Sequence, residues 1–310
     1  MSKIFEAIQK GSGGAAEILP ELLGEQPIPE KPLESAAPSP AAEIPAPVVN
    51  AAPVMNAATI VNGATATPHA AAAHARVLPL QVQSTAPILI FDQQKSRAGE
   101  QYRILRTKIL HHPINPRLIL ISSPGPGDGK TVTAINLAGA LSLKSESKVL
   151  LVDSDFRRSS VHKELGFPVS PGLSDVLSGS VALEQAVIRT QQYPNLYVLT
   201  AGEGRRNPSE LLDSGMWRTL VARLRKEFQY IILDSPPIAA VADYLLLQEV
   251  CDGVVVVIRP DHTNRKMCKS TLETVPPQKM IGAIMNCVED WFLSGVTSTS
   301  GYYYYGNAEN

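Results

Sequence analysis

The sequence lacks the features that would tie it to a bilayer, an oxidising compartment or a nucleic acid. Its three cysteines, Cys251, Cys268 and Cys287, have no paired spacing, so we expect reduced, buried thiols rather than disulfides or a zinc site. No run of about 18 or more apolar residues occurs, and the N-terminal "MSKIFEAIQK" has no apolar signal core, so we expect neither a membrane span nor a secretory signal. The net charge of −1 argues against a nucleic-acid partner.

Composition divides the chain into four parts. Residues 1–25 carry apolar side chains in a loosely helical pattern and are expected to form a short N-terminal helix. Residues 26–86 contain ten prolines and many alanines, with no charged side chain from Ile44 to Ala75, which is typical of a disordered linker. We expect one folded domain at residues 87–290 and a flexible, tyrosine-rich tail at residues 291–310.

Short apolar runs alternate with longer helical patterns across the folded domain. Nearly continuous Val/Ile/Leu runs predict strands buried on both faces, and strand–helix alternation predicts an α/β fold, a mostly parallel sheet with helices on both faces. The expected helices include "TVTAINLAGALSL" and "PSELLDSGMWRTLVARLRKEF". The expected strands are "RLILIS" (117–122), "KVLLVD" (148–153), "LYVLT" (196–200), "YIILD" (230–234), "GVVVVI" (253–258) and "GAIMN" (282–286).

The stretch "LILISSPGPGDGKTVTAINLA" joins a buried strand through a glycine-rich loop to an apolar helix. Glycines let backbone amides approach phosphate oxygens, and the helix N-terminus favours an anion. Lys130 is placed to reach the β- and γ-phosphates and Thr131 to ligate Mg²⁺, although Pro124 replaces the first glycine of G-x-x-x-x-G-K-[ST]. The pattern indicates a P-loop NTPase that binds ATP. Its expected nucleotide-binding residues are Gly125, Gly127, Asp128, Gly129, Lys130, Thr131 and Val132.

Aspartates follow two of the predicted strands: Asp153 and Asp155 in "VLLVDSDFRR", and Asp234 in "YIILDSPP". Because parallel strands end at the same edge of a sheet, we expect these carboxylates beside the phosphate loop. Their repulsion requires a cation, which nucleotide-bound Mg²⁺ supplies. Thr131, Asp155 and Asp234 are therefore the expected metal ligands.

Phosphoryl transfer depends on positioning and charge neutralisation, and Lys130, Asp153 and Asp155 are the candidate catalytic residues. Asp153 is expected to orient an acceptor hydroxyl and to take its proton late, because the pKa values of an aspartate and a tyrosine are poorly matched. For Arg157 and Arg158 two interpretations are equally supported: contact with a phosphate or acceptor, and a solvated loop.

Together these motifs resemble those of the bacterial tyrosine kinases, P-loop enzymes unrelated to the eukaryotic kinase fold. "SSPGPGDGKT" looks like that family's Walker A motif, "LLVDSDFRR" like its Walker A′ motif and "IILDSPP" like its Walker B motif. The likeness spans roughly residues 95–305, and Ser159 stands where many members have proline. Also similar to family stretches are "GLSDVLSG" (172–179), "NPSELL" (207–212) and "VADYLLLQEVCDGVVVVIR" (241–259).

The resemblance implies an ATP- and Mg²⁺-dependent protein-tyrosine autokinase whose acceptors lie in the tail "TSTSGYYYYGNAEN". It also implies packing into rings through an ExxRxxR helix, although the spacing alone would indicate only an ordinary charged helix face. The acceptors would be Tyr302, Tyr303, Tyr304 and Tyr305, and the ring residues Glu100, Arg103 and Arg106.

The N-terminus is similar to that of family members associated with exopolysaccharide systems. This likeness implies control of exopolysaccharide or capsule synthesis, activation by a membrane-anchored polysaccharide co-polymerase, and reversal by a cognate tyrosine phosphatase. The expected location is the cytoplasm, at the inner face of the membrane through that partner.

Two other functions remain as alternatives. A partition-type P-loop ATPase switch would have a second lysine near the start of the loop, but Ser123 to Asp128 contains none, and it would leave the tyrosines unexplained. A non-catalytic nucleotide-binding regulator of polysaccharide assembly is disfavoured by the complete set of phosphate- and metal-binding residues.

Overall fold

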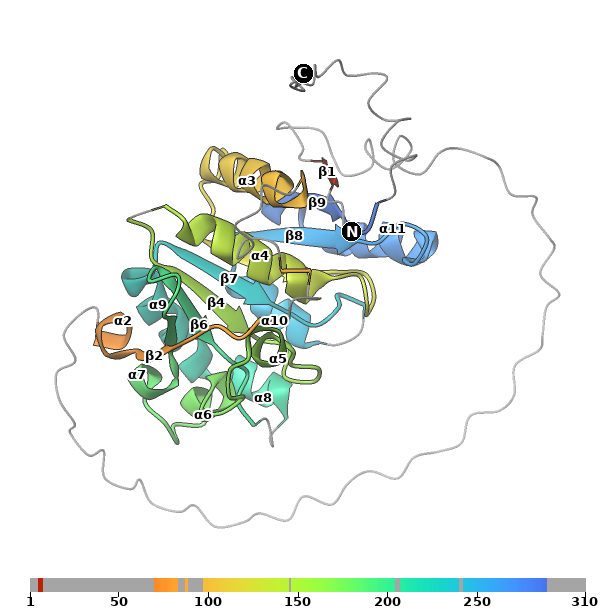
Figure 1. The fold of residues 1–310 in the computed structure, drawn as a ribbon. Helices are drawn as coiled ribbons and strands as arrows, with labels where there is room; N and C mark the ends of the chain where they lie inside the picture. Colours follow the sequence, from red (N-terminus) through yellow and green to blue (C-terminus); the bar gives the residue numbers. More distant parts are fainter. Residues whose placement is uncertain are drawn as a thin grey trace, which may run out of the picture.

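The described part of the chain forms one nine-stranded sheet with helices on both faces (Figure 1). The computed structural model describes residues 5–7, 70–82, 87–88, 97–144, 146–203, 207–239 and 242–288. The strand order is β1-β9-β8-β3-β7-β4-β6-β5-β2, and the six strands from β9 to β6 run parallel. The strands are β1 (Phe5–Ala7), β2 (Arg76–Leu78), β3 (Leu118–Ser122), β4 (Val149–Asp153), β5 (Ile188–Thr190), β6 (Leu196–Leu199), β7 (Tyr230–Asp234), β8 (Gly253–Ile258) and β9 (Met280–Met285).

Alternate residues of the central strands enter two separate hydrophobic layers. In β3, Leu118 and Leu120 pack on one face of the sheet, and Ile119 and Ile121 pack on the other. Helices α3, α4 and α5 cover the second face, and α6 to α11 cover the first. The helices are α2 (Ala70–His74), α3 (Arg97–Leu110), α4 (Lys130–Ser142), α5 (Val161–Leu165), α6 (Leu173–Leu177), α7 (Leu183–Ala186), α8 (Pro208–Asp213), α9 (Gly215–Glu227), α10 (Asp243–Val250) and α11 (Arg265–Thr274), with a 3₁₀ turn η1 (Pro277–Lys279).

The predicted α/β architecture is confirmed, and each of the six expected strands is present. All five residues of β3 and of β4 are buried, as strands covered on both faces must be. The sequence pattern missed β5, a three-residue strand that pairs antiparallel with β6, because so short a run gives no periodic signal.

The expected linker at residues 26–86 is wrong in its last part. Ala70–His74 forms α2, and Arg76–Leu78 pairs with β5 at the edge of the sheet. Ala71 and Ala72 are buried, and the Ala72 amide donates to Glu227 Oε2 at 3.1 Å. Alanine gives little hydrophobic signal in a sequence, but its small side chain allows close packing against a helix. Residues 26–69 and the predicted tail at 291–310 lie outside the described residues.

Two helix predictions are also wrong in part. Phe5–Ala7 pairs with β9 as a strand, and the rest of residues 1–25 lies outside the described part. The stretch expected as one helix after Asn207 is broken at Ser214, whose φ of −69° and ψ of 147° are extended. Ser214 ends α8 by donating to Leu211 O and begins α9 by accepting from Trp217 N.

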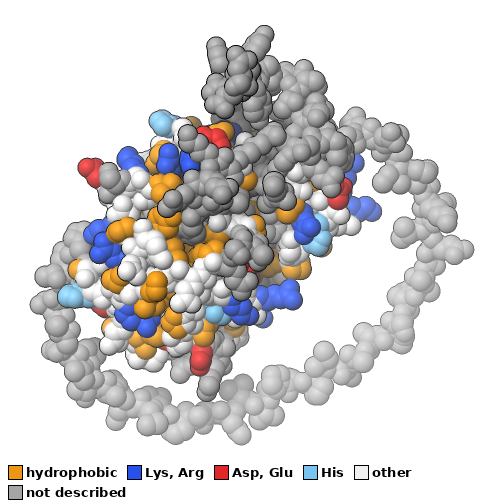
Figure 2. All heavy atoms as spheres, in the orientation of Figure 1, with side chains coloured by type: hydrophobic (Ala, Val, Ile, Leu, Met, Phe, Trp, Pro, Cys, Tyr) orange, Lys and Arg blue, Asp and Glu red, His pale blue; other side chains and the backbone are white. Residues whose placement is uncertain are grey.

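The surface is mixed in character. Apolar side chains remain visible between polar and charged ones on the face in Figure 2, as is usual for globular proteins.

Cys251 and Cys268 are buried as expected, whereas Cys287 is exposed in the turn that follows β9. Among the helices that the structure describes, none has the length and apolarity needed to cross a bilayer.

Replacing Glu227 by alanine is expected to loosen the 70–82 segment at the sheet edge, where the pairing of β2 with β5 remains. The substitution leaves the Ala72 amide without its buried acceptor, which costs about 1–3 kcal/mol locally. Hydrogen exchange followed by mass spectrometry should show faster exchange at residues 70–82 and unchanged exchange in β3 and β7. Glu227→Gln keeps an acceptor oxygen and is the matched control. Unchanged exchange at residues 70–82 in the alanine variant would contradict this account of the docking.

Candidate active site

The phosphate loop runs from the end of β3 at Ser122 to Lys130, the first residue of α4. Gly127 and Gly129 have φ values of 86° and 92°, in the left-handed region that favours glycine. These two positions let the chain turn directly into the helix, so that the first amides of α4 face the loop. Val132, another predicted nucleotide-binding residue, is half-buried in the first turn of α4.

Asp128 holds the phosphate loop together from within. Its Oδ2 accepts from the Gly125 amide at 3.1 Å, and its Oδ1 accepts from Thr263 Oγ1 at 2.7 Å. The side chain is fully buried, so these bonds are shielded from water. Asp128 was expected among the nucleotide-binding residues, and the structure gives its side chain the part of an internal support.

Two residues from neighbouring strand ends hold the loop from outside. Asn286, just after β9, donates from Nδ2 to Asp128 O at 3.0 Å. The His262 ring, in the loop after β8, lies with Nε2 3.1 Å from Pro126 O. A Cβ at Gly129 would lie only 1.9 Å from Asn286 Nδ2, so the close approach of Asn286 requires glycine there.

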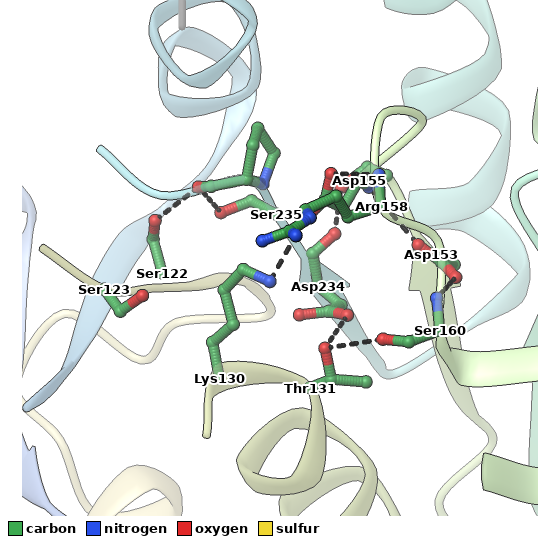
Figure 3. A network of polar contacts seen from close by, with 12 residues as sticks. Ser122, Ser123, Lys130, Thr131, Asp153, Asp155, Arg158, Ser160, Asp234 and Ser235 are labelled. Atoms are coloured by element: carbon green, nitrogen blue, oxygen red, sulfur yellow. Dashed lines mark hydrogen bonds and ion pairs between the residues drawn. The ribbon is translucent and has the colours of Figure 1, made fainter. Parts of the chain in front are cut away.

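The residues expected to handle phosphate and metal converge beside the loop (Figure 3). Lys130 Nζ lies 3.1 Å from Asp155 Oδ2 in an ion pair that is largely buried. Thr131 Oγ1 donates to Asp234 Oδ2 at 2.7 Å and accepts from Ser160 Oγ at 3.0 Å. The structure thus brings together residues from α4, from the ends of β4 and β7, and from the loop before α5.

Asp153 faces a different way from the other two aspartates. Its Oδ2 accepts from the amides of Ser160 and Val161, each at 3.1 Å, so it caps the start of α5. Burial raises the pKa of Asp153 to about 8, and the Asp234 carboxylate adds to this rise. The carboxylate is fully covered, and its oxygens point towards its own loop.

Burial also leaves unsatisfied negative charge in the site. Asp234 Oδ1 is buried with no hydrogen-bond partner among the described residues, and Asp155 Oδ2 has only the Lys130 ammonium. Burial raises the pKa of Asp234 to about 6, while Lys130 and the Thr131 hydroxyl oppose the rise. Carboxylates this close and this dry call for a further cation.

The other predicted residues lie apart from this group. Glu100, Arg103 and Arg106 are on α3, which packs along α4 on the face of the sheet that α3, α4 and α5 cover (Figure 1). Glu100 Oε2 and Arg103 Nη1 form an exposed ion pair of 2.7 Å within the helix, and Arg106 Nη1 donates to Ala140 O at 3.3 Å. The predicted acceptors, residues 302–305, lie outside the described part of the chain.

Known proteins share this fold and sequence. A family model described as an AAA domain matches residues 116–277. Tyrosine-protein kinase YwqD of Bacillus subtilis (strain 168) is 35% identical over 227 residues, which are 72% of this chain and 92% of that protein. Tyrosine-protein kinase ptk of Acinetobacter johnsonii is 33% identical over 227 residues, which are 72% of this chain and 31% of that protein.

Solved structures agree with the sequence relatives. The chimerical protein CapA2B2 matches with a TM-score of 0.60 and 30% identity, over 66% of this chain and 92% of that chain. The kinase domain of Escherichia coli tyrosine kinase ETK matches with a TM-score of 0.60 and 25% identity, over 76% of this chain and 94% of that chain. The chain belongs to the bacterial tyrosine kinase family.

The site of this bacterial tyrosine kinase fits Mg²⁺. Its donors are hard oxygens, and Asp234 Oδ1 is a buried acceptor with no partner in the described part. Among the described residues no three His, Cys, Asp or Glu side chains form a complete metal cage. Mg²⁺ commonly uses one or two carboxylates together with substrate phosphates. Thr131 and Asp234 would hold the ion, and Asp155, the third expected ligand, faces Lys130.

Sequence reasoning missed the residues that support the kinase site from outside it. Ser160 bonds Thr131, and Asn286 and Thr263 bond the phosphate loop. A weak signal is present, because Asn286 ends one predicted parallel strand and Thr263 follows another, where ligand-binding edges form. Their contacts with Asp128 depend on residues more than a hundred positions away, which no local pattern shows.

Gly129→Ala is expected to destabilise the phosphate loop far more than Gly125→Ala. The Gly129 variant would place a Cβ 1.9 Å from Asn286 Nδ2 at a φ of 92°, whereas a Cβ at Gly125 meets Met267 Sδ at an ordinary 3.5 Å. We expect a cost of about 1–3 kcal/mol for Gly129→Ala. Thermal unfolding of both variants checks this expectation. Equal melting temperatures would show that the loop is not constrained as described.

Proposed function

We propose that this kinase transfers the γ-phosphoryl group of ATP to tyrosine hydroxyls, and that Tyr302 to Tyr305 are its acceptors. The observation that carries the proposal is the convergence of Lys130, Thr131 and three buried carboxylates beside a phosphate loop. In the transfer, the bond between the γ-phosphorus and the β–γ bridging oxygen breaks, and a bond to the phenolic oxygen forms. The leaving group is ADP, and the phenol loses its proton.

The nucleotide end of the site binds charge. The amides of the phosphate loop and of the first turn of α4 receive the phosphates, and Lys130 turns from Asp155 to the β- and γ-oxygens. Thr131 and Asp234, already joined at 2.7 Å, present their oxygens to the metal ion. Mg²⁺ held there would supply positive charge to offset the charge that develops during the transfer.

The acceptor end requires a proton acceptor near the transferred group. We assign this role to Asp153, because burial raises its pKa from the ordinary carboxyl value towards that of a phenol. Because the Ser160 and Val161 amides cover it, we infer that residues 154–160 shift when an acceptor enters. The carboxylate then orients the hydroxyl and receives its proton as the phosphoryl group transfers.

The tyrosines follow the last described residue at a short distance along the sequence. Tyr302 lies fourteen positions after Val288, a reach of at most about 45 Å. Each phosphotyrosine would add a charge of about −1.5 to −2. A cluster of four would therefore convert a segment whose one charged side chain is Glu309 into a strongly acidic one, a change suited to regulation. From the family resemblance we propose that it controls exopolysaccharide or capsule synthesis with a membrane-anchored activator, reversed by a tyrosine phosphatase.

Incubating the full chain with ATP and Mg²⁺, with and without candidate activator fragments, tests this function. Mass spectrometry should locate phosphate on Tyr302 to Tyr305. Lys130→Met is expected to lower labelling by about a hundredfold or more, because it removes the phosphate-binding cation. Replacing the four tyrosines by phenylalanine should abolish tail labelling while nucleotide binding persists.

Two results would overturn the proposal. Steady ATP hydrolysis with unmodified tyrosines under every condition would indicate a partition-type ATPase switch. Nucleotide binding with neither hydrolysis nor labelling, in the presence of activator fragments, would indicate a non-catalytic regulator.

We further propose that α3 joins copies of the kinase into a ring. Glu100 and Arg103 are exposed, and their pairing within one helix contributes only about 0.3–0.5 kcal/mol, so either can re-pair with a neighbour. Arg103→Glu should reduce the particle mass measured by light scattering. Arg218→Glu, which reverses the charge of an exposed arginine paired across α9 and α10 with Glu249, is the control. A mass unchanged by Arg103→Glu would remove α3 from the interface.

A further inference from the structure

The loop after β4 carries two adjacent arginines whose side chains have different surroundings. The sequence gives no reason to separate Arg157 from Arg158, because both follow Asp155 within three positions. In the structure both are exposed in part, but only Arg157 is bound by another side chain. This difference in pairing indicates separate roles for the two arginines.

Arg157 fastens the loop to the far side of the site. Its Nε donates to Asp243 Oδ2 at 2.8 Å, and its Nη2 lies 3.5 Å from Asp243 Oδ1. Asp243 is almost fully buried at the start of α10 and also accepts from Ser209 Oγ on α8. Hydrogen bonding to Asp243 and its negative charge raise the pKa of Arg157 above its ordinary value. Arg157 is therefore committed to an internal ion pair and is not free to hold a ligand.

Arg158 is anchored by its backbone and free at its side chain. Its amide donates to Asp155 Oδ1 at 3.0 Å, while Asp155 Oδ2 faces Lys130 Nζ at 3.1 Å. One carboxylate therefore places Arg158 next to Lys130. Figure 3 shows the Arg158 side chain extending back across the site towards the ammonium end of Lys130. Among the described residues, no side chain or carbonyl pairs with the Arg158 guanidinium.

Two cations directed at the same space repel one another unless an anion lies between them. An anion that contacts both an ammonium and a guanidinium turns this repulsion into two attractions. Asp155 forms an ion pair with Lys130, and the charge of Lys130 also acts on Asp234. A multiply charged oxyanion that contacts both Lys130 and Arg158 would therefore be bound by two positive charges. A guanidinium also offers several donors in one plane, which matches phosphate oxygens.

We propose that Arg158 is a catalytic residue that binds the γ-phosphoryl oxygens beside Lys130, while Arg157 and Asp243 are positioning residues that hold its loop. The inference rests on the proposed kinase function. Arg158 stays protonated throughout. As the bond to the β–γ bridging oxygen breaks and the bond to the phenolic oxygen forms, its donors follow the charge on the three equatorial oxygens. The phenolic proton is transferred to the Asp153 carboxylate.

The direct test compares nucleotides that differ only in the γ-phosphate. Calorimetric titrations of the full chain with Mg²⁺ and either ADP or a non-hydrolysable ATP analogue give the preference for the triphosphate. We expect Arg158→Ala to weaken analogue binding by about 10- to 100-fold and to leave ADP binding within about twofold. Arg158→Lys, which keeps the charge but loses the planar donors, should fall between wild type and alanine.

Two further variants separate contact from positioning. Arg157→Ala should weaken binding of the ATP analogue by a smaller factor than Arg158→Ala does. Adding Asp243→Asn to Arg157→Ala should not weaken analogue binding further, because both substitutions remove the same ion pair. Arg218→Ala, an exposed arginine paired with Glu249 on the outer helices, is the control for loss of a positive charge. It should leave both nucleotide affinities unchanged.

The outcomes are distinguishable. Equal losses of ADP and analogue affinity in Arg158→Ala, or no loss of either, would overturn the assignment of Arg158 to the γ-phosphate. A wild-type protein that binds neither nucleotide would instead overturn the proposed kinase function. A wild type that prefers the triphosphate, together with an Arg158→Ala variant that has lost this preference, supports both.

Discussion

The burial of three carboxylates around a single lysine is the constraint on which this site depends. Asp153, Asp155 and Asp234 are each at most 1% exposed, at the ends of two adjacent strands. Burial raises the pKa of Asp153 and of Asp234, which means that the negative charge of these carboxylates costs free energy in the site. The Lys130 ammonium, the Thr131 hydroxyl and two backbone amides offset part of that cost by pairing with the carboxylates. A bound cation with its phosphates would relieve the rest, which links the electrostatics of the fold to nucleotide binding.

The sheet supplies the rigidity that such a site needs. Because β3, β4, β7, β8 and β9 are parallel neighbours, the loops that follow them meet at one edge. The loops after β8 and β9 hold the phosphate loop through Thr263 and Asn286, and the loop after β4 is tied to α10 through Asp243. Strand β2 pairs with β5 and forms the last strand at one end of the strand order.

Most of the site could be predicted because its signals are local. A strand, a glycine-rich loop and a helix in succession place Lys130 and Thr131, and the parallel-sheet rule places Asp234. The orientation of Asp153 could not be predicted, since a carboxylate at a strand end can face a ligand or cap the next helix. The same limit hid the docking of residues 70–82, which depends on distant partners, including strand β5 and Glu227. Separating Arg157 from Arg158 likewise required Asp243, a partner 86 residues away.

A crystal structure of the full chain with Mg²⁺ and a non-hydrolysable ATP analogue tests the central claim most directly. The account predicts that Lys130 Nζ leaves Asp155 and contacts the β- and γ-phosphate oxygens. It also predicts that Asp234 Oδ1, a buried acceptor with no partner among the described residues, turns to the metal or one of its waters. Nucleotide bound away from the phosphate loop, or Lys130 still paired with Asp155 beside a bound triphosphate, would contradict the account.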